Sequence, residues 1–393
     1  MKKYKLGEIC EIVSGSTPKT SIEEYWDGEV KWITPAELDD ESYIINDSVR
    51  KITELAVKKT GLSPFPEGTV ILSSRAPIGK VAIAGCEMYC NQGFKNLICS
   101  EKINNKYLFW FLKGNTSFLN SLGRGATFKE ISKKIVADIK INVPDLEQQK
   151  TVVKILERIS SLIQLRKQEI QKLEDLIRAR FVEMFGDAVA NPMNWPVKKL
   201  KDLSVQINSG NTPKGGSENY VEEGITFFRS QNVWKDRLEM DDIAYIDADT
   251  HASMKRSSLK HGDILMTKTG RINTENSSLG RAALYMGEDD MANVNGHVYF
   301  IRLKAEVNNK FVLRILVSPE YRDLIRSVCV GGIDKRQLNK EHIEEFPIIC
   351  PPIDMIDSFV DFCEQIDKSK AVIQKALDKT QLLFDSLMQK YFG

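Results

Sequence analysis

The chain of 393 residues lacks the sequence features of membrane and secreted proteins. It has no run of about 18 apolar residues, so no membrane span is expected. The basic residues near the N-terminus are followed by no apolar stretch, so they do not form a signal peptide. The seven cysteines are scattered and odd in number, which favours free thiols in a reducing compartment. We therefore expect a cytoplasmic protein with no membrane partner.

Catalytic and metal-binding motifs are also missing. Neither a Gly-x4-Gly-Lys-Ser/Thr phosphate loop nor a Gly-x-Gly-x-x-Gly turn occurs. Cys86 and Cys90 have no second Cys or His pair nearby, and the four histidines show no ligand spacing, so no metal site is predicted. Residues 191–194, Asn-Pro-Met-Asn, only faintly resemble the Asn-Pro-Pro-Tyr element of adenine methyltransferases, because the second proline and the aromatic residue that stacks on a flipped base are absent. We therefore predict no catalytic residues in this chain.

The chain has no excess of charge of either sign. It contains 55 Lys and Arg against 54 Asp and Glu, for a net charge of +1. A strongly basic domain is the electrostatic signature of nucleic-acid binding, so this composition neither demands nor excludes DNA. A DNA-binding protein with this balance must concentrate its positive side chains locally, or rely on partners for them.

The most informative feature present is an internal repeat. The pattern Ser-Gly-x-Thr-Pro-Lys occurs at residues 14–19 and again at 209–214, an offset of 195 residues. Further matches follow in the same order along both halves, and the offset reaches 207 where Pro144 matches Pro351. Among these matches, Arg75 and Gly79-Lys80 correspond to Lys268 and Gly280-Arg281, and residues 91–93 correspond to 294–296. The second copy therefore contains about a dozen inserted residues, which we place in loops.

Each copy ends in a long stretch with helical periodicity. Residues 146–185 contain no Pro or Gly, and apolar residues recur at alternating steps of three and four from Val152 to Met184, interrupted by Arg166 and Arg180. Residues 353–391 repeat this pattern, with Lys370 and Thr380 as polar members. Such spacing is typical of a coiled coil, and 40 helical residues extend about 60 Å. We expect the two helices to pair antiparallel; alternatives are that each packs on a partner protein or only stabilises the chain.

The predicted fold is an α+β protein with two homologous globular domains separated by two long helices that form an antiparallel coiled coil, a pseudo-two-fold internal repeat. The domain boundaries are expected at 1–144, 145–187, 188–350 and 351–393. Strands are expected at 70–72, 80–84, 96–99 and 139–143, and at 264–267, 282–285, 299–303 and 348–350. Helices are expected at 105–113 and 310–317, with short ones near 129–134 and 336–342.

Polar loops between these strands carry the candidate binding residues. Arg can bond guanine, and Asn or Gln can bond adenine, through paired hydrogen bonds in the major groove. Lys, Ser and Thr suit phosphates, which position a protein without specifying sequence. Each loop alone is an ordinary solvated surface; their matched placement in both copies favours DNA binding. The candidate DNA-binding residues are Thr17, Lys19, Arg75, Lys80, Gln92, Arg124, Lys129, Lys214, Arg229, Gln231, Lys268, Arg271, Arg281, Asn295, Lys335 and Arg336.

The whole chain resembles the specificity subunit of type I restriction–modification enzymes. The resemblance rests on the two Ser-Gly-x-Thr-Pro-Lys openings, on the strands after Glu67-Gly68 and His261-Gly262, and on Val-Pro-x-Leu-Glu-Gln-Gln at residues 143–149 leading into the first long helix. The second copy departs from this pattern, because residues 351–356 lack the Glu-Gln pair. Any role assigned to those polar residues is therefore in doubt in the second copy.

The resemblance implies two target-recognition domains that bind double-stranded DNA as an asymmetric bipartite target. It implies two methyltransferase subunits that bring S-adenosylmethionine, and endonuclease/translocase subunits that use ATP and magnesium, while this chain binds no cofactor itself. The rival interpretations are a non-catalytic scaffold whose duplicated modules bind proteins and, less favoured, a duplicated enzyme with an unrecognised site.

Overall fold

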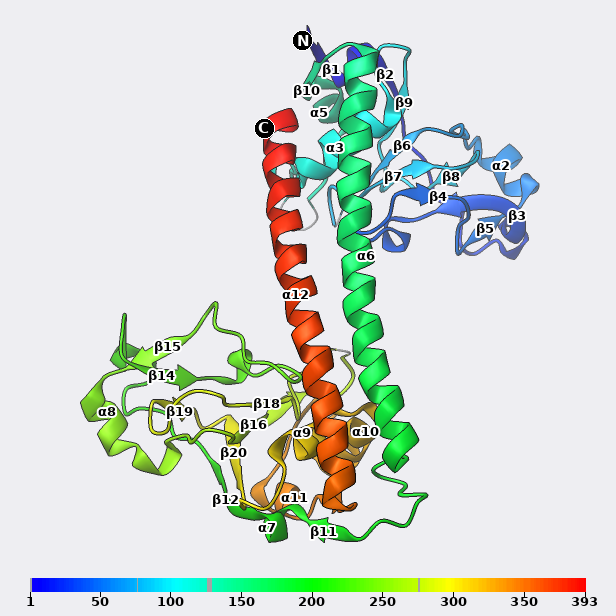
Figure 1. The fold of residues 1–393 in the computed structure, drawn as a ribbon. Helices are drawn as coiled ribbons and strands as arrows, with labels where there is room; N and C mark the ends of the chain where they lie inside the picture. Colours follow the sequence, from blue (N-terminus) through cyan, green and yellow to red (C-terminus); the bar gives the residue numbers. More distant parts are fainter. Residues whose placement is uncertain (1, 76, 126–128, 275) are drawn as a thin grey trace. The chain divides into compact units, whose positions relative to one another are not determined.

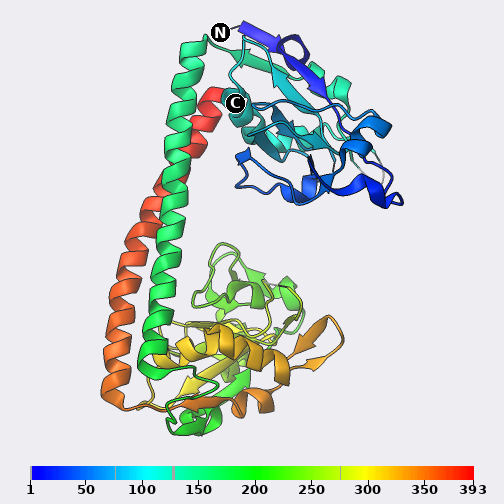
Figure 2. The same cartoon turned by 90° about the vertical axis from the view of Figure 1, so that its right-hand side faces the viewer.

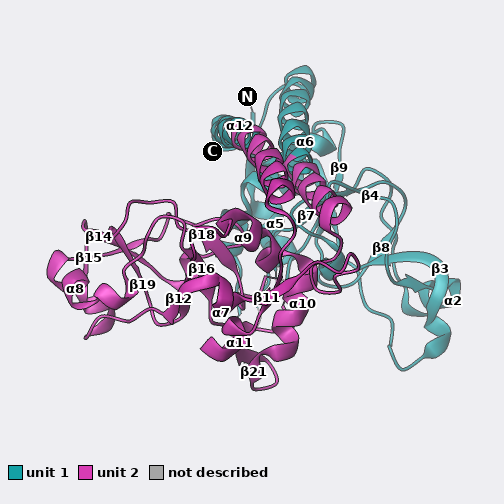
Figure 3. Cartoon of the chain, turned by 60° about the horizontal axis from the view of Figure 1, so that its bottom comes forward, with its two compact units in different colours: residues 1–169, 373–393 teal, residues 170–372 magenta. Residues whose placement is uncertain are grey.

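The structure is a computed structural model that describes residues 2–75, 77–125, 129–274 and 276–393. It divides into two compact units: unit 1 contains residues 1–169 and 373–393, and unit 2 contains residues 170–372 (Figure 3). Each unit contains one globular domain and segments of both long helices, α6 (Leu146–Phe185) and α12 (Ile353–Phe392). Across the described residues, no helix is long and apolar enough to cross a membrane.

Unit 1 is built on a five-stranded sheet of order β2-β9-β6-β7-β4 (Figure 1). Unit 1 also has a second sheet, of order β5-β3-β8, and a two-stranded sheet in which β1 pairs with β10. All residues of helix α3 from Tyr107 to Leu112 are buried in the main core. The strands are β1 (Lys2–Lys5), β2 (Cys10–Val13), β3 (Trp26–Ile33), β4 (Ile44–Ile45), β5 (Lys51–Ile52), β6 (Val70–Leu72), β7 (Val81–Ala84), β8 (Tyr89–Cys90), β9 (Asn96–Cys99) and β10 (Lys140–Val143). The short helices are α1 (Leu6–Ile9), α2 (Glu54–Thr60), α3 (Asn105–Gly114), α4 (Thr116–Ser121) and α5 (Lys133–Asp138).

Unit 2 has a matching four-stranded sheet of order β12-β20-β16-β18. Its additional sheets have the orders β13-β15-β14-β19, β17-β22-β21 and β11-β23. The strands are β11 (Val197–Lys199), β12 (Ser204–Ser209), β13 (Tyr220–Val221), β14 (Ile225–Phe228), β15 (Ala244–Ile246), β16 (Ile264–Thr267), β17 (Thr269–Arg271), β18 (Ala282–Leu284), β19 (Ala292–Val294), β20 (Val298–Leu303), β21 (Val330–Gly331), β22 (Lys335–Gln337) and β23 (Pro347–Ile349). The helices are α7 (Leu200–Leu203), α8 (Ala248–Ser253), α9 (Asn309–Val317), α10 (Pro319–Val328) and α11 (Lys340–Glu344).

The sequence repeat is reproduced in side-chain contacts. Asn104 caps α3 by accepting the backbone N–H of Tyr107, and Asn308 caps α9 by accepting that of Phe311, both at 3.2 Å. The following asparagines donate to glycine carbonyls: Asn105 to Gly68 at 2.9 Å and Asn309 to Gly262 at 3.1 Å. A capping side chain satisfies backbone donors that the first helical turn leaves free. The repeat therefore preserves the residues that start each core helix.

The two long helices pack against each other within each unit, and their contacts run antiparallel. In unit 1, Arg166 donates to the carbonyl of Ala376 at 2.6 Å and to Thr380 Oγ1. In unit 2, Lys370 forms an ion pair with Glu174 at 3.2 Å. Higher numbers on α6 thus face lower numbers on α12 in both units. The seam residues from Val152 to Met184 are all buried or half-buried, which confirms the coiled-coil pattern.

The Glu-Gln pair that only the first copy contains has a structural role at Gln149. This side chain is fully buried; its Oε1 accepts the Asn104 N–H at 2.7 Å, and its Nε2 donates to the carbonyls of Lys102 and Pro144 at 3.1 and 2.9 Å. By the repeat offset, Ile356 occupies the matched position in unit 2 and lies in the apolar core. In the second copy, therefore, the start of the long helix is held by apolar packing of Ile356 where the first copy uses the hydrogen bonds of Gln149. The helix itself is present in both copies.

The predicted fold class is confirmed: two β-rich domains accompany two long helices that pack together. Most predicted strands and both core helices lie within one or two residues of their expected ends. The two short helices begin later than expected, at Lys133 and Lys340. In the second copy the cause is visible, because residues 335–337 are used as strand β22. The sequence also failed to predict α10, a full helix in unit 2.

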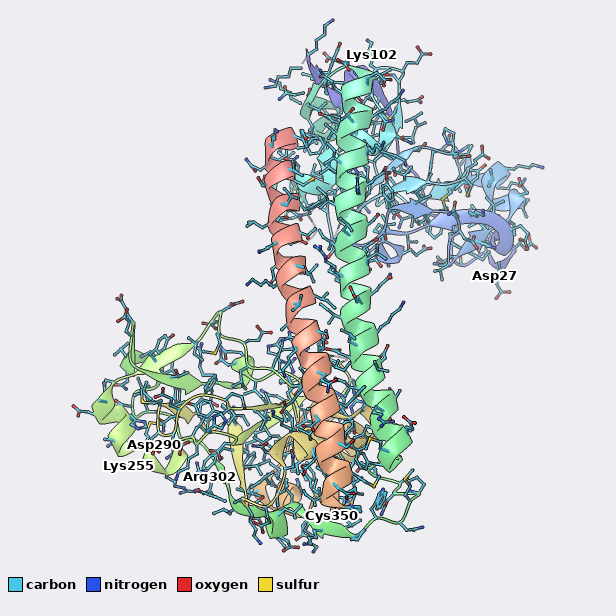
Figure 4. The ribbon with its side chains drawn as sticks, in the orientation of Figure 1. Asp27, Lys102, Lys255, Asp290, Arg302 and Cys350 are labelled. Carbon is cyan, nitrogen blue, oxygen red and sulfur yellow. The ribbon has the colours of Figure 1, made fainter. Side chains whose placement is uncertain are left out.

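A buried ion pair stabilises the sheet of unit 2. Asp263 is 1% exposed, and Arg302, labelled in Figure 4, donates to both of its carboxylate oxygens at 2.9 and 2.8 Å. Burial raises the pKa of Asp263, while the hydrogen bonds from Arg302 and the backbone of Lys260 oppose that rise. At the matched position of unit 1, Thr69 donates to the carbonyl of Pro66 at 2.7 Å. The pair is thus particular to unit 2.

We expect Asp263→Ala to lower the free energy of unfolding of unit 2 by about 3–5 kcal/mol, because it leaves the Arg302 guanidinium without its carboxylate. Urea unfolding followed by tryptophan fluorescence measures this change. Glu345→Ala serves as the control: its carboxylate pairs with Lys199 and Lys201 on the surface, and its loss should change stability little. Equal effects of the two substitutions would contradict a structural role for the buried pair.

Candidate nucleic-acid interface

In unit 1, four polar loops that are far apart in the sequence meet at one edge of the central sheet. Thr17 Oγ1 donates to Gln92 Oε1 at 2.6 Å. The Ser74 N–H donates to the Gly93 carbonyl at 2.7 Å, and the Ile131 N–H donates to the Ser74 carbonyl at 3.0 Å. We call this surface loop cluster 1. Its described residues are 14–19, 73–75, 91–93, 124–125 and 129–130; residues 126–128 lie outside the described part of the chain.

Unit 2 has the same arrangement at the matched edge of its sheet. The Asn211 N–H donates to the Val294 carbonyl at 3.1 Å, and the Lys268 N–H donates to the His297 carbonyl at 2.8 Å. The Leu338 N–H donates to the Lys268 carbonyl at 2.9 Å, and β17 pairs with β22, which with β21 forms a hairpin that projects from the domain (Figure 2). We call this surface loop cluster 2. Its residues are 209–214, 268–271, 294–297 and 335–338.

The glycine of each Ser-Gly opening makes this convergence possible. A Cβ on Gly15 would lie less than 3.0 Å from the backbone of Cys90, and a Cβ on Gly210 would lie less than 3.0 Å from the backbone of Val294. A glycine is required wherever two backbones approach this closely. The repeated motif therefore anchors the first loop of each cluster against the strand that ends beside it.

Six of the seven predicted residues of unit 1 lie in loop cluster 1. Thr17, Lys19, Gln92, Arg124 and Lys129 are exposed. Arg75 is also exposed, and its guanidinium forms an ion pair with Glu130 at 2.9 Å. Lys80 lies outside the cluster: it is half-buried, and its ammonium group donates to the Leu38 carbonyl. Its positive charge is therefore used inside the domain.

Six of the nine predicted residues of unit 2 lie in loop cluster 2. They are Lys214, Lys268, Arg271, Asn295, Lys335 and Arg336. Arg229 and Gln231 lie beside the cluster, where both hold the carboxylate of Asp242, at 3.1 and 2.8 Å respectively. Arg281 lies outside it: the side chain is buried, donates to the Ser277 carbonyl at 3.0 Å, and lies 3.8 Å from the centre of the Trp234 ring. The geometry thus assigns Arg281, like Lys80, to the domain interior.

The structure shifts two of the matches between the copies by one residue. Asn295 corresponds to Asn91, because each Oδ1 accepts the backbone N–H two residues later, from His297 at 3.0 Å and Gly93 at 2.9 Å. Lys268 corresponds to Ser74, as their equivalent backbone bonds show. An Asn bond of this kind shapes a turn. The Asn295 oxygen therefore fixes the loop, and only its amide nitrogen is left for an external partner.

Ion pairs lie within loop cluster 1 and beside loop cluster 2, while several other cations of the two clusters form none. Burial would raise the pKa of Glu130, but hydrogen bonds from Lys95 and Arg75 outweigh it and hold that pKa below its usual value. Hydrogen bonds from Gln231 and Arg229 lower the pKa of Asp242 in the same way. These acids stay ionised and orient the cations beside them. Five cations of the clusters take part in none of the ion pairs found in the described part of the chain: Lys19, Arg124, Lys129, Lys214 and Lys335.

Sequence reasoning missed residues that contact the loops of the clusters or line a hollow next to them. The Lys95 ammonium is almost fully buried and reaches Glu130 at 3.2 Å and Ser74 Oγ at 3.3 Å. In unit 2, a hollow of about 400 Å³ adjoins residues 211–214 and is lined also by Asn219, Thr250 and Ser253. These side chains come from segments with no shared local pattern, so only the folded chain brings them together.

The fold and its two clusters define a class of protein: a duplicated, polar-loop recognition module carried on long helices. The sequence pattern described as "Type I restriction modification DNA specificity domain" matches residues 1–175 and 192–382. The chain therefore belongs to the family of type I restriction–modification specificity subunits. It is the DNA specificity subunit of such a system, the non-catalytic member of a multi-subunit complex.

Individual relatives agree with this assignment. The chain is 30% identical to the type I restriction enzyme MjaIX specificity subunit of Methanocaldococcus jannaschii over 98% of this chain and 91% of the relative. It is 27% identical to the EcoR124I/EcoR124II specificity subunit of Escherichia coli, over 44% of this chain and 46% of the relative. The fold is similar to that of the crystallised S subunit from M. genitalium, with a TM-score of 0.57 and 14% identity over 100% of this chain and 96% of that one.

Proposed function

We propose that the two loop clusters read two different half-sites of one asymmetric, bipartite duplex target. The observation that carries this proposal is that four loops converge in the same way in both units, while the side chains they present differ. Cluster 1 presents Gln92 and Arg124, whereas cluster 2 presents Arg271, Lys335 and Arg336. Arg, Asn and Gln side chains discriminate bases, so the shared framework with different loops supports two unlike half-sites.

The experiment is a selection from duplexes with two randomised segments separated by gaps of several lengths. The full chain with its methyltransferase subunits is the binding species, and the retained duplexes are sequenced. Enrichment of two unlike motifs at one fixed gap is the expected result. No enrichment over the starting pool would remove the proposal and favour the scaffold interpretation.

We propose further that the long helices receive the partner subunits. In unit 1, Leu162 and Leu165 on α6 are 40% and 59% exposed, and Leu382 and Leu383 on α12 are 72% and 52% exposed. Because Arg166 contacts Ala376 and Thr380, these four leucines lie at the same level of the helix pair. We propose that they belong to one apolar surface, of the kind that another protein covers. A methyltransferase subunit that carries S-adenosylmethionine is the proposed occupant.

We expect the double variant Leu165→Glu, Leu382→Glu to lower the affinity for the methyltransferase subunit by at least tenfold, because two charges would be buried in the interface. Analytical ultracentrifugation of the mixed subunits measures this. Gln168→Glu, which adds a negative charge at an exposed polar position on the same helix, is the control and should assemble normally. Normal assembly of the double variant would place the partner elsewhere.

The remaining parts of the proposal follow from the family. Endonuclease/translocase subunits that use ATP and magnesium would complete a restriction complex, and this chain would bring them to the target without binding a cofactor. A complex that modifies the chromosome works in the cytoplasm. In the described residues, no group of three or more His, Cys, Asp or Glu side chains is arranged to hold a metal ion.

A further inference from the structure

Two of the cysteines that are scattered in the sequence lie opposite each other in the main sheet of unit 1. Cys10 begins the edge strand β2, and Cys99 ends the neighbouring strand β9 (Figure 1). They are 89 positions apart in the chain, but the register of the two antiparallel strands makes them direct partners. Both thiols are free. The fold therefore creates a pair of thiols that the sequence does not reveal.

The two cysteines occupy a non-hydrogen-bonded position of the strand pair. The Cys10 N–H donates to the Leu6 carbonyl and not to Cys99. The adjacent pair is joined by a bond from the Ser100 N–H to the Ile9 carbonyl at 2.9 Å. Opposite residues at a non-hydrogen-bonded position have Cα atoms about 4.5 Å apart, and disulfides usually join residues whose Cα atoms are about 4.4–6.8 Å apart. A bond between the two sulfur atoms therefore needs no change of strand register.

The two side chains lie on the same face of the sheet. Directly opposite residues of an antiparallel pair share a face, and both cysteines pack in the main core of unit 1. In agreement with this placement, a hydrogen bond between the two side chains is the first cause that raises the pKa of Cys10, and burial is the second. Cys99 is half-buried whereas Cys10 is buried, so Cys99 is the thiol that meets solvent first.

Serine and leucine, which are not thiols, occupy the matched positions of unit 2. Ser204 follows helix α7 as Cys10 follows α1, and it pairs with Leu303 on β20. The bond that flanks the pair is also repeated, from the Lys304 N–H to the Leu203 carbonyl at 2.9 Å. The duplicated framework therefore accepts other residues at these two positions, and the pair of thiols is particular to unit 1.

We propose that Cys10 and Cys99 are a modification site for low-molecular-weight disulfides such as oxidised glutathione, and that they form a reversible disulfide. Cys99 loses its proton to water and its thiolate attacks one sulfur atom of the reagent, whose S–S bond breaks. Cys10 then loses its proton to water and attacks the Cys99 sulfur atom, which releases the second half of the reagent. Each leaving thiolate takes up one proton. Two protein thiols are thus oxidised to one disulfide, and one reagent molecule is reduced to two thiols.

The disulfide joins the edge strand that leads into loop cluster 1. Strand β2 is held to the sheet by four residue pairs with β9, and residues 14–19 of the cluster follow it directly. A crosslink between residues far apart in the chain restricts the unfolded state and so favours the folded one. Oxidation therefore stabilises unit 1 and keeps β2 paired, while the side chains of the loops stay as they are. This inference does not depend on the proposed DNA-reading function.

The test incubates the reduced full chain in glutathione buffers with an increasing oxidised fraction. Free thiols are then trapped by alkylation, and the peptides are mapped by mass spectrometry. We expect one disulfide, between Cys10 and Cys99, and a thermal midpoint of unfolding that is higher by about 5–15 °C. Dithiothreitol should reverse both changes.

Two single variants make the test specific. Cys10→Ser breaks the pair with little risk to folding, because Ser204 at the matched position of unit 2 donates to the Leu200 carbonyl at 2.7 Å. This variant should hold glutathione on Cys99 as a mixed disulfide and gain no stability. Cys86→Ser removes a half-buried thiol outside the pair and should behave as the wild type does.

Four results would overturn the inference. The wild type could form no disulfide even in fully oxidised glutathione, or could keep glutathione on Cys99 without forming the internal bond. The disulfide could join a different pair of cysteines. A bond between Cys10 and Cys99 that left the thermal midpoint unchanged or lowered it would show that it does not secure the folded edge strand.

Discussion

Replacing Gly210 with alanine should abolish recognition of the half-site read by unit 2. The new Cβ would lie less than 3.0 Å from backbone atoms of both Val294 and Asn295. Backbone atoms cannot rotate away, so one of the two loops must move, and overpacking of this kind costs about 1–3 kcal/mol. Because residues 211–214 and 295–297 belong to loop cluster 2, the displacement falls on the surface that we propose reads bases. We expect at least a hundredfold loss of affinity for the cognate duplex, with the affinity for random DNA largely kept.

Gly296→Ala is the matched control, because it adds the same methyl group to the same cluster. Its nearest neighbours would be 3.7 Å away, an ordinary contact, and neither glycine has a positive φ. This variant should bind the cognate duplex within a few-fold of wild type. Fluorescence anisotropy with cognate and random duplexes measures both variants. Cognate affinity of Gly210→Ala equal to that of Gly296→Ala would show that the close approach of these loops has no role in recognition.

Lengthening both long helices together should change the gap between half-sites that the protein accepts. The change is a seven-residue duplication within residues 163–173 of α6 and another within residues 371–381 of α12. Seven residues keep the three-four seam in register on each helix. They add about 10 Å of helix, which corresponds to roughly three base pairs at about 3.4 Å each. We expect the original target to lose binding by more than a hundredfold and a target with a gap longer by about two to three base pairs to gain it.

Binding to duplexes that differ only in gap length measures this change. A seven-residue insertion after the exposed Glu222 in unit 2 is the control for chain length, and it should leave the preferred gap unchanged. If the doubly lengthened protein folded and still preferred the original gap, the helices would not set the half-site separation. Binding to neither gap, with normal thermal unfolding, would also argue against this role.

The sequence predicted the parts of the fold that depend on regular patterns. The three-four seam predicted both long helices, because its residues lie on one face of each helix, and from Val152 to Met184 they are all buried or half-buried. The repeat predicted two copies of one domain, since residues such as Asn104 and Asn308 start equivalent helices by the same capping bond. Short apolar runs bounded by turn residues located strands such as β6 and β16, all of whose residues are buried.

The site could be predicted only in outline. Loop positions followed from the repeat, and 12 of the 16 candidate residues lie in the two clusters. Lys80 and Arg281 could not be separated from the others, because whether a cation faces solvent or a backbone carbonyl depends on contacts across the fold. The sequence comparison matched Asn91 with Val294, one residue away from its structural counterpart Asn295. Only the structure shows the correct match, because Asn91 and Asn295 each accept the backbone N–H two residues later.

The central claim is that two unlike modules on one chain define one bipartite target. Sequencing the methylated positions in a host genome that expresses this chain with its methyltransferase subunits tests that claim most directly. The expected result is a single motif made of two different half-sites separated by a gap of fixed length and free sequence, with a methylated base in each half. A continuous motif, a palindrome of identical half-sites, or methylation without a motif would contradict the account.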